Sequence, residues 1–201
     1  MNQVFNTKLP TLLDTTRLCN LIKYAVRANE TMDSNAVFAE FGSYKGGSGE
    51  IIAKACPNRS LFLIDSYQGL PDLQDERDFH HTGEFSDVDY IGTVGYFKML
   101  YQNVRILKGF SPSVFEFFDD KTKFTFLHID VDVYRSGKDA IDFFWPKLLP
   151  GGYMLWDDYG FSSCRGLKAI VDEFVENLDC KFKGELVDPD GVSSKQYLII
   201  K

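Results

Sequence analysis

The stretch AVFAEFGSYKGGSGEIIAKAC, residues 36–56, decides the fold. It begins with a short apolar run at 36–42, continues through a glycine-rich turn and ends in a segment with helical spacing that begins near Ser48. Gly42, Gly46 and Gly47 permit tight turns and close approach of the backbone to a charged small molecule. The stretch therefore predicts a strand, a ligand-binding loop and a helix.

The rest of the chain repeats this alternation of short apolar runs and longer amphipathic segments. Further strands are predicted at 60–66, 103–109, 124–130, 151–158, 180–186 and 195–200, and helices at 12–29, 47–56, 94–102, 111–120, 136–149 and 165–178. This order predicts an α/β fold with a parallel sheet. The turn-rich connector at 187–194 leaves no room for a helix, so the last two strands should be antiparallel neighbours.

Composition predicts one domain over residues 1–201, with a helical segment at 1–35 before the first strand. The net charge of −7 and the scattered basic residues argue against nucleic acid as a partner. The chain shows neither a membrane-spanning apolar stretch nor an N-terminal targeting signal, so we expect a cytoplasmic protein. The four widely spaced cysteines are expected to be reduced, buried thiols.

Residues 67–94 fit neither the helical nor the strand period and are rich in Asp, Gly, His and aromatic residues. A loop of this length in a compact domain is usually functional, so we predict a lid or substrate loop. His80 and His81 lie within it, and three roles stay open for them: alternative base, acceptor contact, or exposed side chains without a role.

Carboxylates gather where the predicted strands end. In an open parallel sheet, ligands bind outside the carboxyl ends of the strands, and six carboxylates there would repel one another without a cation or hydroxyl donors. Asp65 follows Gly42 by about 20 residues, the spacing of an acid that binds ribose hydroxyls, so a ribose-containing cofactor is predicted. The six acids are Glu40, Asp65, Asp130, Asp132, Asp157 and Asp158.

Three of these acids, Asp130, Asp157 and Asp158, are expected to converge, because the strands that they follow should be neighbours. The set contains no His or Cys. An all-oxygen site favours a hard cation, so Mg²⁺ is predicted, with Mn²⁺ or Ca²⁺ as alternatives.

Five motifs in order resemble class I S-adenosylmethionine-dependent methyltransferases. More narrowly, they resemble the macrocin O-methyltransferase family of metal-dependent sugar methyltransferases, and more distantly catechol O-methyltransferases. The resemblance covers roughly residues 36–176. The motifs are AEFGSYKGGS (39–48), DSYQGLP (65–71), DVDVYRS (130–136), LLPGGYMLWDDYG (148–160) and CRGLKAIVDEF (164–174).

The resemblance implies a Rossmann-like, seven-stranded, mostly parallel sheet with an antiparallel C-terminal hairpin and helices on both faces. It implies that Asp65 binds the ribose of S-adenosylmethionine, that Asp130, Asp157 and Asp158 hold Mg²⁺, and that Asp132 is the general base for a sugar hydroxyl. A homodimer is a further family-level expectation. The cofactor set that it implies is Glu40, Gly42, Tyr44, Gly47, Ser48, Asp65 and Ser66.

Two features depart from that family. Val131 stands where a glycine is usual in the Asp-x-Asp motif, and residues 1–35 are fewer than expected in members that act on large macrolides. The resemblance is therefore not taken to imply a macrolide acceptor for this chain.

Three other functions compete with a methyltransferase. A glycosyltransferase would use the Asp-x-Asp motif but leaves Glu40 and the Asp157–Asp158 pair unexplained. A nicotinamide-dependent oxidoreductase shares the glycine turn and the ribose acid but seldom needs three metal-facing acids. A non-catalytic module that binds S-adenosylmethionine would have no use for Asp132.

Overall fold

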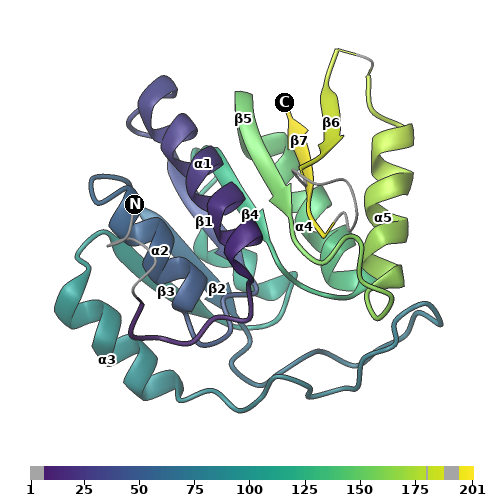
Figure 1. The fold of residues 1–201 in the computed structure, drawn as a ribbon, viewed down its shortest axis with the longest axis horizontal. Helices are drawn as coiled ribbons and strands as arrows, with labels where there is room; N and C mark the ends of the chain where they lie inside the picture. Colours follow the sequence, from purple (N-terminus) through teal and green to yellow (C-terminus); the bar gives the residue numbers. More distant parts are fainter. Residues whose placement is uncertain (1–6, 180, 188–194) are drawn as a thin grey trace.

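A single mixed sheet of seven strands forms the centre of the molecule (Figure 1). The computed structural model describes residues 7–179, 181–187 and 195–201. The strand order is β3-β2-β1-β4-β5-β7-β6, with β7 antiparallel to both β5 and β6 and every other pair parallel. The strands are β1 (Val37–Phe41), β2 (Leu61–Asp65), β3 (Val104–Lys108), β4 (Phe124–Ile129), β5 (Leu148–Trp156), β6 (Lys183–Leu186) and β7 (Tyr197–Ile200).

The predicted fold class is confirmed, including the antiparallel C-terminal strands. Each strand lies within a few residues of its predicted place. β4 and β5 are neighbours, as the prediction of a shared acidic site required. Apart from Val187, the connector predicted at 187–194 lies outside the described residues.

Helices cover both faces of the sheet (Figure 1). One apolar cluster joins the sheet to the first three helices, and a second cluster joins its other face to the remaining helical elements. The helices on one face are α1 (Thr15–Thr31), α2 (Gly47–Ala55) and α3 (Tyr90–Leu100). Those on the other face are the 3-10 helix η1 (Ser113–Phe117), α4 (Tyr134–Lys147) and α5 (Arg165–Glu176).

Two predicted helices were wrong in extent. The helix expected at 111–120 is only the short η1, because one 3-10 turn suffices to place Phe115 and Phe118 in the core. The helix expected at 94–102 begins earlier, at Tyr90, because the Asp89 side chain caps it by accepting from the backbone N–H of Gly92 at 3.0 Å. The end of the predicted loop 67–94 is therefore helical.

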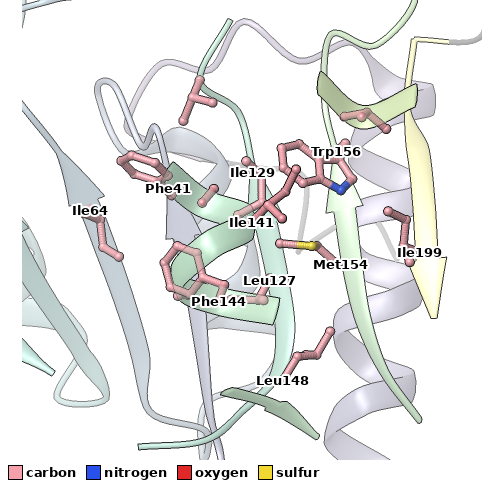
Figure 2. Packing of buried hydrophobic residues seen from close by; sticks show 14 of the residues in the cluster. Phe41, Ile64, Leu127, Ile129, Ile141, Phe144, Leu148, Met154, Trp156 and Ile199 are labelled. Carbon is pink, nitrogen blue, oxygen red and sulfur yellow. The ribbon is translucent and has the colours of Figure 1, made fainter. Parts of the chain in front are cut away.

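Alternating side chains along the strands divide the core between the two faces. On β4, Phe126 packs toward α1 and α2, whereas Leu127 and Ile129 pack toward α4. Phe124 packs on the α4 side as well, because the pairing register shifts between Phe124 and Phe126. Figure 2 shows Ile141 of α4 among the buried residues of the central strands.

Among the described residues, no helix combines the length and the apolar character needed to cross a bilayer.

Gly42 ends β1 and controls how closely the glycine-rich loop approaches β4. Its φ of +92° lies in the left-handed region, and a Cβ built on it would lie 1.6 Å from the backbone oxygen of Asp130. The backbone N–H of Gly42 donates to Ile64 at 2.9 Å, and that of Asp130 donates to Phe41 at 2.8 Å. Only glycine allows the loop to lie directly against Asp130.

Gly42→Ala should destabilise the protein by at least about 2 kcal/mol, since the new methyl group meets fixed backbone at an unfavourable φ. The matched control is Gly95→Ala in α3, where a Cβ meets nothing within 4 Å. Because alanine is the better helix former, that change should stabilise the protein by about 0.5 to 1 kcal/mol. Urea unfolding measures both, and equal effects would contradict the steric argument.

Candidate active site

A cavity lies at the carboxyl edge of the sheet, where the loops after β1, β2, β3, β4 and β5 meet. The segment before α1 and the loop between β2 and α3 complete its wall. It is lined by residues 10–13, 17, 41–44, 48, 65–66, 69–71, 80, 85, 109–111, 130–132, 136, 158 and 163–164.

Most of the predicted site residues line this cavity. From the cofactor set, these are Gly42, Tyr44, Ser48, Asp65 and Ser66, and from the acidic set they are Asp130, Asp132 and Asp158. Glu40, Gly47 and Asp157 lie behind the wall instead, and Glu40 and Asp157 are fully buried.

Asp65 is held at the cavity wall by two backbone donors. The N–H of Tyr44 lies 2.8 Å from its Oδ2, and the N–H of Tyr67 lies 2.7 Å from its Oδ1. Burial raises the pKa of Asp65, while these two bonds lower it. The carboxylate is thus fixed in orientation, and its remaining lone pairs can accept from ligand hydroxyls.

Glu40 forms a buried pair with His128. Glu40 Oε1 lies 2.9 Å from His128 Nδ1, and both side chains are fully buried. Within the described part of the chain, Glu40 Oε2 and His128 Nε2 have no hydrogen-bond partner. His128 is paired at Nδ1, and its Nε2 lies 4.0 Å from Asp157 Oδ2.

Asp130, Asp132 and Asp158 form a tight acidic cluster. One oxygen from each lies within 4.8 Å of the other two. Burial raises the pKa of Asp130 and of Asp132 well above the ordinary range, and the neighbouring carboxylates raise both further. In their ionised forms, these carboxylates would therefore repel one another strongly unless a cation lay among them.

Arg17 of α1 supplies part of the missing positive charge, and sequence reasoning did not identify it. Its Nη1 lies 2.9 Å from both Asp157 Oδ2 and Asp158 Oδ1, and its Nη2 donates to the Leu12 carbonyl at 2.7 Å. The guanidinium is buried; burial opposes its charge, but these carboxylates raise the pKa of Arg17. In the sequence, Arg17 was one cation on an amphipathic helix, with no local signal of a partner 140 residues away.

The remaining oxygens fit a hard divalent cation. Asp157 Oδ1 is buried and, in the part of the chain that the structure describes, accepts no hydrogen bond. Asp157 lies in one group of potential ligand atoms with Asp130 and His128, and Asp158 lies in another with Asp130 and Asp132. The second group is all-oxygen, which Mg²⁺ prefers. Asp130, Asp157 and Asp158 could hold the ion, with Asp132 beside them.

The loop 67–89 forms part of the cavity wall and contacts the glycine-rich loop. Leu70 and Gly83 pair through their backbones, with the Gly83 N–H donating to Leu70 at 2.9 Å. Phe85 packs against Tyr44 of the glycine-rich loop, with ring centroids 5.8 Å apart. Its place agrees with the predicted lid, whose function stays a prediction.

His80 connects this loop to Asp132. His80 Nδ1 lies 3.0 Å from Glu84 Oε2, and its Nε2 lies 3.7 Å from Asp132 Oδ1. His81 is exposed and reaches Glu84 only through its backbone N–H, at 3.0 Å. Of the two loop histidines, only His80 lines the cavity.

Cys164 lies beside His80 at the N-cap of α5, and burial raises the pKa of its thiol. It was predicted to be one of four inert buried thiols, and its position at the cavity wall is a second feature that sequence reasoning missed. Cys56 is also buried, whereas Cys19 is exposed, contrary to the prediction; Cys180 lies outside the described residues.

Comparison with known proteins gives consistent matches. A family model described as Macrocin-O-methyltransferase (TylF) matches residues 9–195. Demethyldecarbamoylnovobiocin O-methyltransferase of Streptomyces niveus is 27% identical over 168 residues, 76% of this chain and 63% of that protein. Mycinamicin III 3''-O-methyltransferase of Micromonospora griseorubida is 27% identical over 161 residues, 68% of this chain and 63% of that protein. The chain thus spans 63% of the length of either relative.

Solved structures share the fold. The O-methyltransferase NovP superposes with a TM-score of 0.77 at 23% identity, over 95% of this chain and 81% of that one. A calicheamicin methyltransferase superposes with a TM-score of 0.71 at 16% identity, over 99% of this chain and 88% of that one.

Arg17→Met should lower the free energy of unfolding by about 3 kcal/mol, because it leaves the carboxylates of Asp157 and Asp158 without their buried cation. Thermal and urea unfolding measure the loss. The control is Lys138→Met, which removes an exposed ion pair with Asp142 and should cost less than about 1 kcal/mol.

A second change separates charge from packing. Asp157→Asn added to Arg17→Met removes one of the uncompensated charges and should restore part of the lost stability. Strictly additive losses would show that Arg17 acts through packing alone.

Proposed function

Because the chain belongs to the macrocin-O-methyltransferase (TylF) family, we propose that it transfers the methyl group of S-adenosylmethionine to a hydroxyl group of a sugar-containing small molecule. Family membership confirms the resemblance inferred from the five motifs. Activity, cofactor, metal and acceptor are inferred from the site and from the relatives.

One observation carries the proposal: a single cavity is lined both by the glycine-rich loop with Asp65 and by the cluster of Asp130, Asp132 and Asp158. The part lined by the glycine-rich loop and Asp65 suits a nucleoside, since Asp65 can accept hydrogen bonds from ribose hydroxyls. The part lined by Asp130, Asp132 and Asp158 suits a cation and the hydroxyl group to be methylated. A methyl donor and its acceptor would therefore meet in one enclosed space.

Asp132 is the proposed general base. A sugar hydroxyl is too weakly acidic to ionise near neutral pH, so its proton must pass to a nearby group as the new bond forms. The acceptor oxygen bonds to the methyl carbon while the carbon–sulfur bond breaks, and the hydroxyl proton moves to a carboxylate oxygen of Asp132. Bound Mg²⁺ would supply Lewis acidity that makes the hydroxyl easier to deprotonate.

The proposed acceptor class follows the relatives. The name of one relative describes 3''-O-methylation of mycinamicin III. The name of another, from Streptomyces olivaceus, describes 4'-O-methylation of a rhamnosyl-tetracenomycin. Both are small natural products, and the second name specifies a sugar. We therefore propose a glycosylated small molecule as acceptor for this chain.

The family match argues against two of the competing functions. The matched family model describes neither a glycosyltransferase nor a nicotinamide-dependent oxidoreductase. The non-catalytic module stays as the alternative that experiment must address. A cytoplasmic location and a homodimer remain predictions.

Asp132→Asn should lower kcat about 10²- to 10⁴-fold, because the amide keeps the shape of the side chain but cannot take up the proton. Binding of S-adenosylmethionine, measured by calorimetry, should be unchanged. The control is Asp142→Asn on the exposed face of α4, where the carboxylate pairs with Lys138. Activity is measured as S-adenosylhomocysteine released with a panel of glycosylated acceptors.

Unaltered turnover in Asp132→Asn would remove the base assignment. Wild-type protein that binds S-adenosylmethionine yet releases no product with Mg²⁺ and any acceptor of the panel would favour the non-catalytic module.

Excess EDTA should abolish methyl transfer, and added Mg²⁺ should restore it. Asp158→Asn should raise the Mg²⁺ concentration for half-maximal activity at least about tenfold, since it removes a proposed ligand. Full activity in excess chelator would contradict the metal site.

A further inference from the structure

Three side chains of different chemistry meet on the cavity wall beside the acidic cluster. They are His80 of the loop 67–89, Asp132 after β4 and Cys164 at the N-cap of α5. His80 Nε2 lies 3.4 Å from Cys164 Sγ, Cys164 Sγ lies 3.6 Å from Asp132 Oδ1, and His80 Nε2 lies 3.7 Å from the same oxygen. Imidazole, thiol and carboxylate thus form a nearly equilateral triangle.

The triangle has the size that a tetrahedral zinc ion requires. With bonds of about 2.0 Å to nitrogen and oxygen and about 2.3 Å to sulfur, neighbouring ligand atoms lie about 3.3 to 3.6 Å apart. The three measured separations are at most a few tenths of an ångström from that range. Only small movements would bring all three atoms to an ion.

Further contacts support the potential ligands. Glu84 Oε2 lies 3.0 Å from His80 Nδ1, and a carboxylate in that place fixes the ring and leaves Nε2 free to coordinate. Ser163 Oγ lies 3.5 Å from Cys164 Sγ. Cys164 stands at the N-cap of α5, and an ion bound there would have to displace the proton of its thiol. The three atoms therefore have the surroundings of metal ligands.

We propose that His80, Asp132 and Cys164 form a second cation site, which takes a borderline-soft divalent ion of the Zn²⁺ type. Sulfur and imidazole ligands favour such an ion over Mg²⁺, whereas the carboxylates proposed to hold Mg²⁺ have the opposite preference. All three residues line the cavity, so a fourth coordination position would open into it.

The site has a consequence for the loop and for the base. An ion there would tie His80, and with it the loop 67–89, to Asp132. It would also bind Asp132, the proposed general base, through Oδ1. Zn²⁺ would therefore tie the loop to the cavity wall and inhibit methyl transfer.

Cobalt substitution tests the site directly. Co²⁺ is added to the purified full chain in saturating Mg²⁺, which fills the proposed Mg²⁺ site. We expect a sulfur-to-cobalt charge-transfer band in the near ultraviolet, together with the strong visible bands of tetrahedral Co²⁺. Cys164→Ser should lose the charge-transfer band, whereas Cys19→Ser, which removes an exposed thiol, should keep it.

Affinity measurements test the surrounding contacts. Glu84→Gln should weaken Co²⁺ binding about 10- to 100-fold, the usual effect of losing a carboxylate that orients a histidine ligand. Glu76→Gln, at an exposed position of the same loop, should leave binding unchanged. His80→Gln, which removes the imidazole ligand, should weaken binding further than Glu84→Gln and repeats the test if Cys164→Ser does not fold.

Absence of the charge-transfer band in the wild type, or its persistence in Cys164→Ser, would overturn the proposal. Equal affinities of Glu84→Gln and Glu76→Gln for Co²⁺ would also overturn it. The readout needs neither S-adenosylmethionine nor an acceptor, so its failure is distinct from failure of the methyl-transfer proposal.

Discussion

Charge compensation at one edge of the sheet is the constraint on which the site depends. Parallel strands β4 and β5 end side by side, so the acids that follow them cannot avoid one another. Buried carboxylates need a cation or a hydrogen-bond donor, or else they bind protons. Arg17 reaches across from α1 to meet two of them, and that ion pair fixes the N-terminal segment as one wall of the cavity.

The ion pair divides the acids into two groups. Asp157 and Asp158 each give one oxygen to Arg17, while Asp157 Oδ1 is left buried without a hydrogen bond among the described residues. Asp130 and Asp132 face the cavity, and burial raises the pKa of both. Arg17 thus compensates only part of the negative charge that these carboxylates would carry when ionised, and a divalent ion would compensate more of it.

The fold was predictable because its signals are local. The turn at Gly42 and the apolar runs were sufficient to predict the strands, the parallel order and the antiparallel end. Errors arose where short-range contacts altered helix ends: Asp89 caps α3 earlier than its periodicity indicated, and η1 stops once its aromatic rings are buried. Cavity residues at strand ends, such as Asp65 and Asp130, were predictable for the same reason, since strand ends converge at one edge.

The sequence by itself determined the order of strands and helices, the acids that follow the strands and the family. Each of these depends on the spacing of residues along the chain. Only the tertiary structure decided which groups compensate those acids. Arg17 lies 140 residues from Asp157, and His80 lies 84 residues from Cys164. Contacts at such separations depend on how helices and loops pack on the sheet, and no local pattern encodes them.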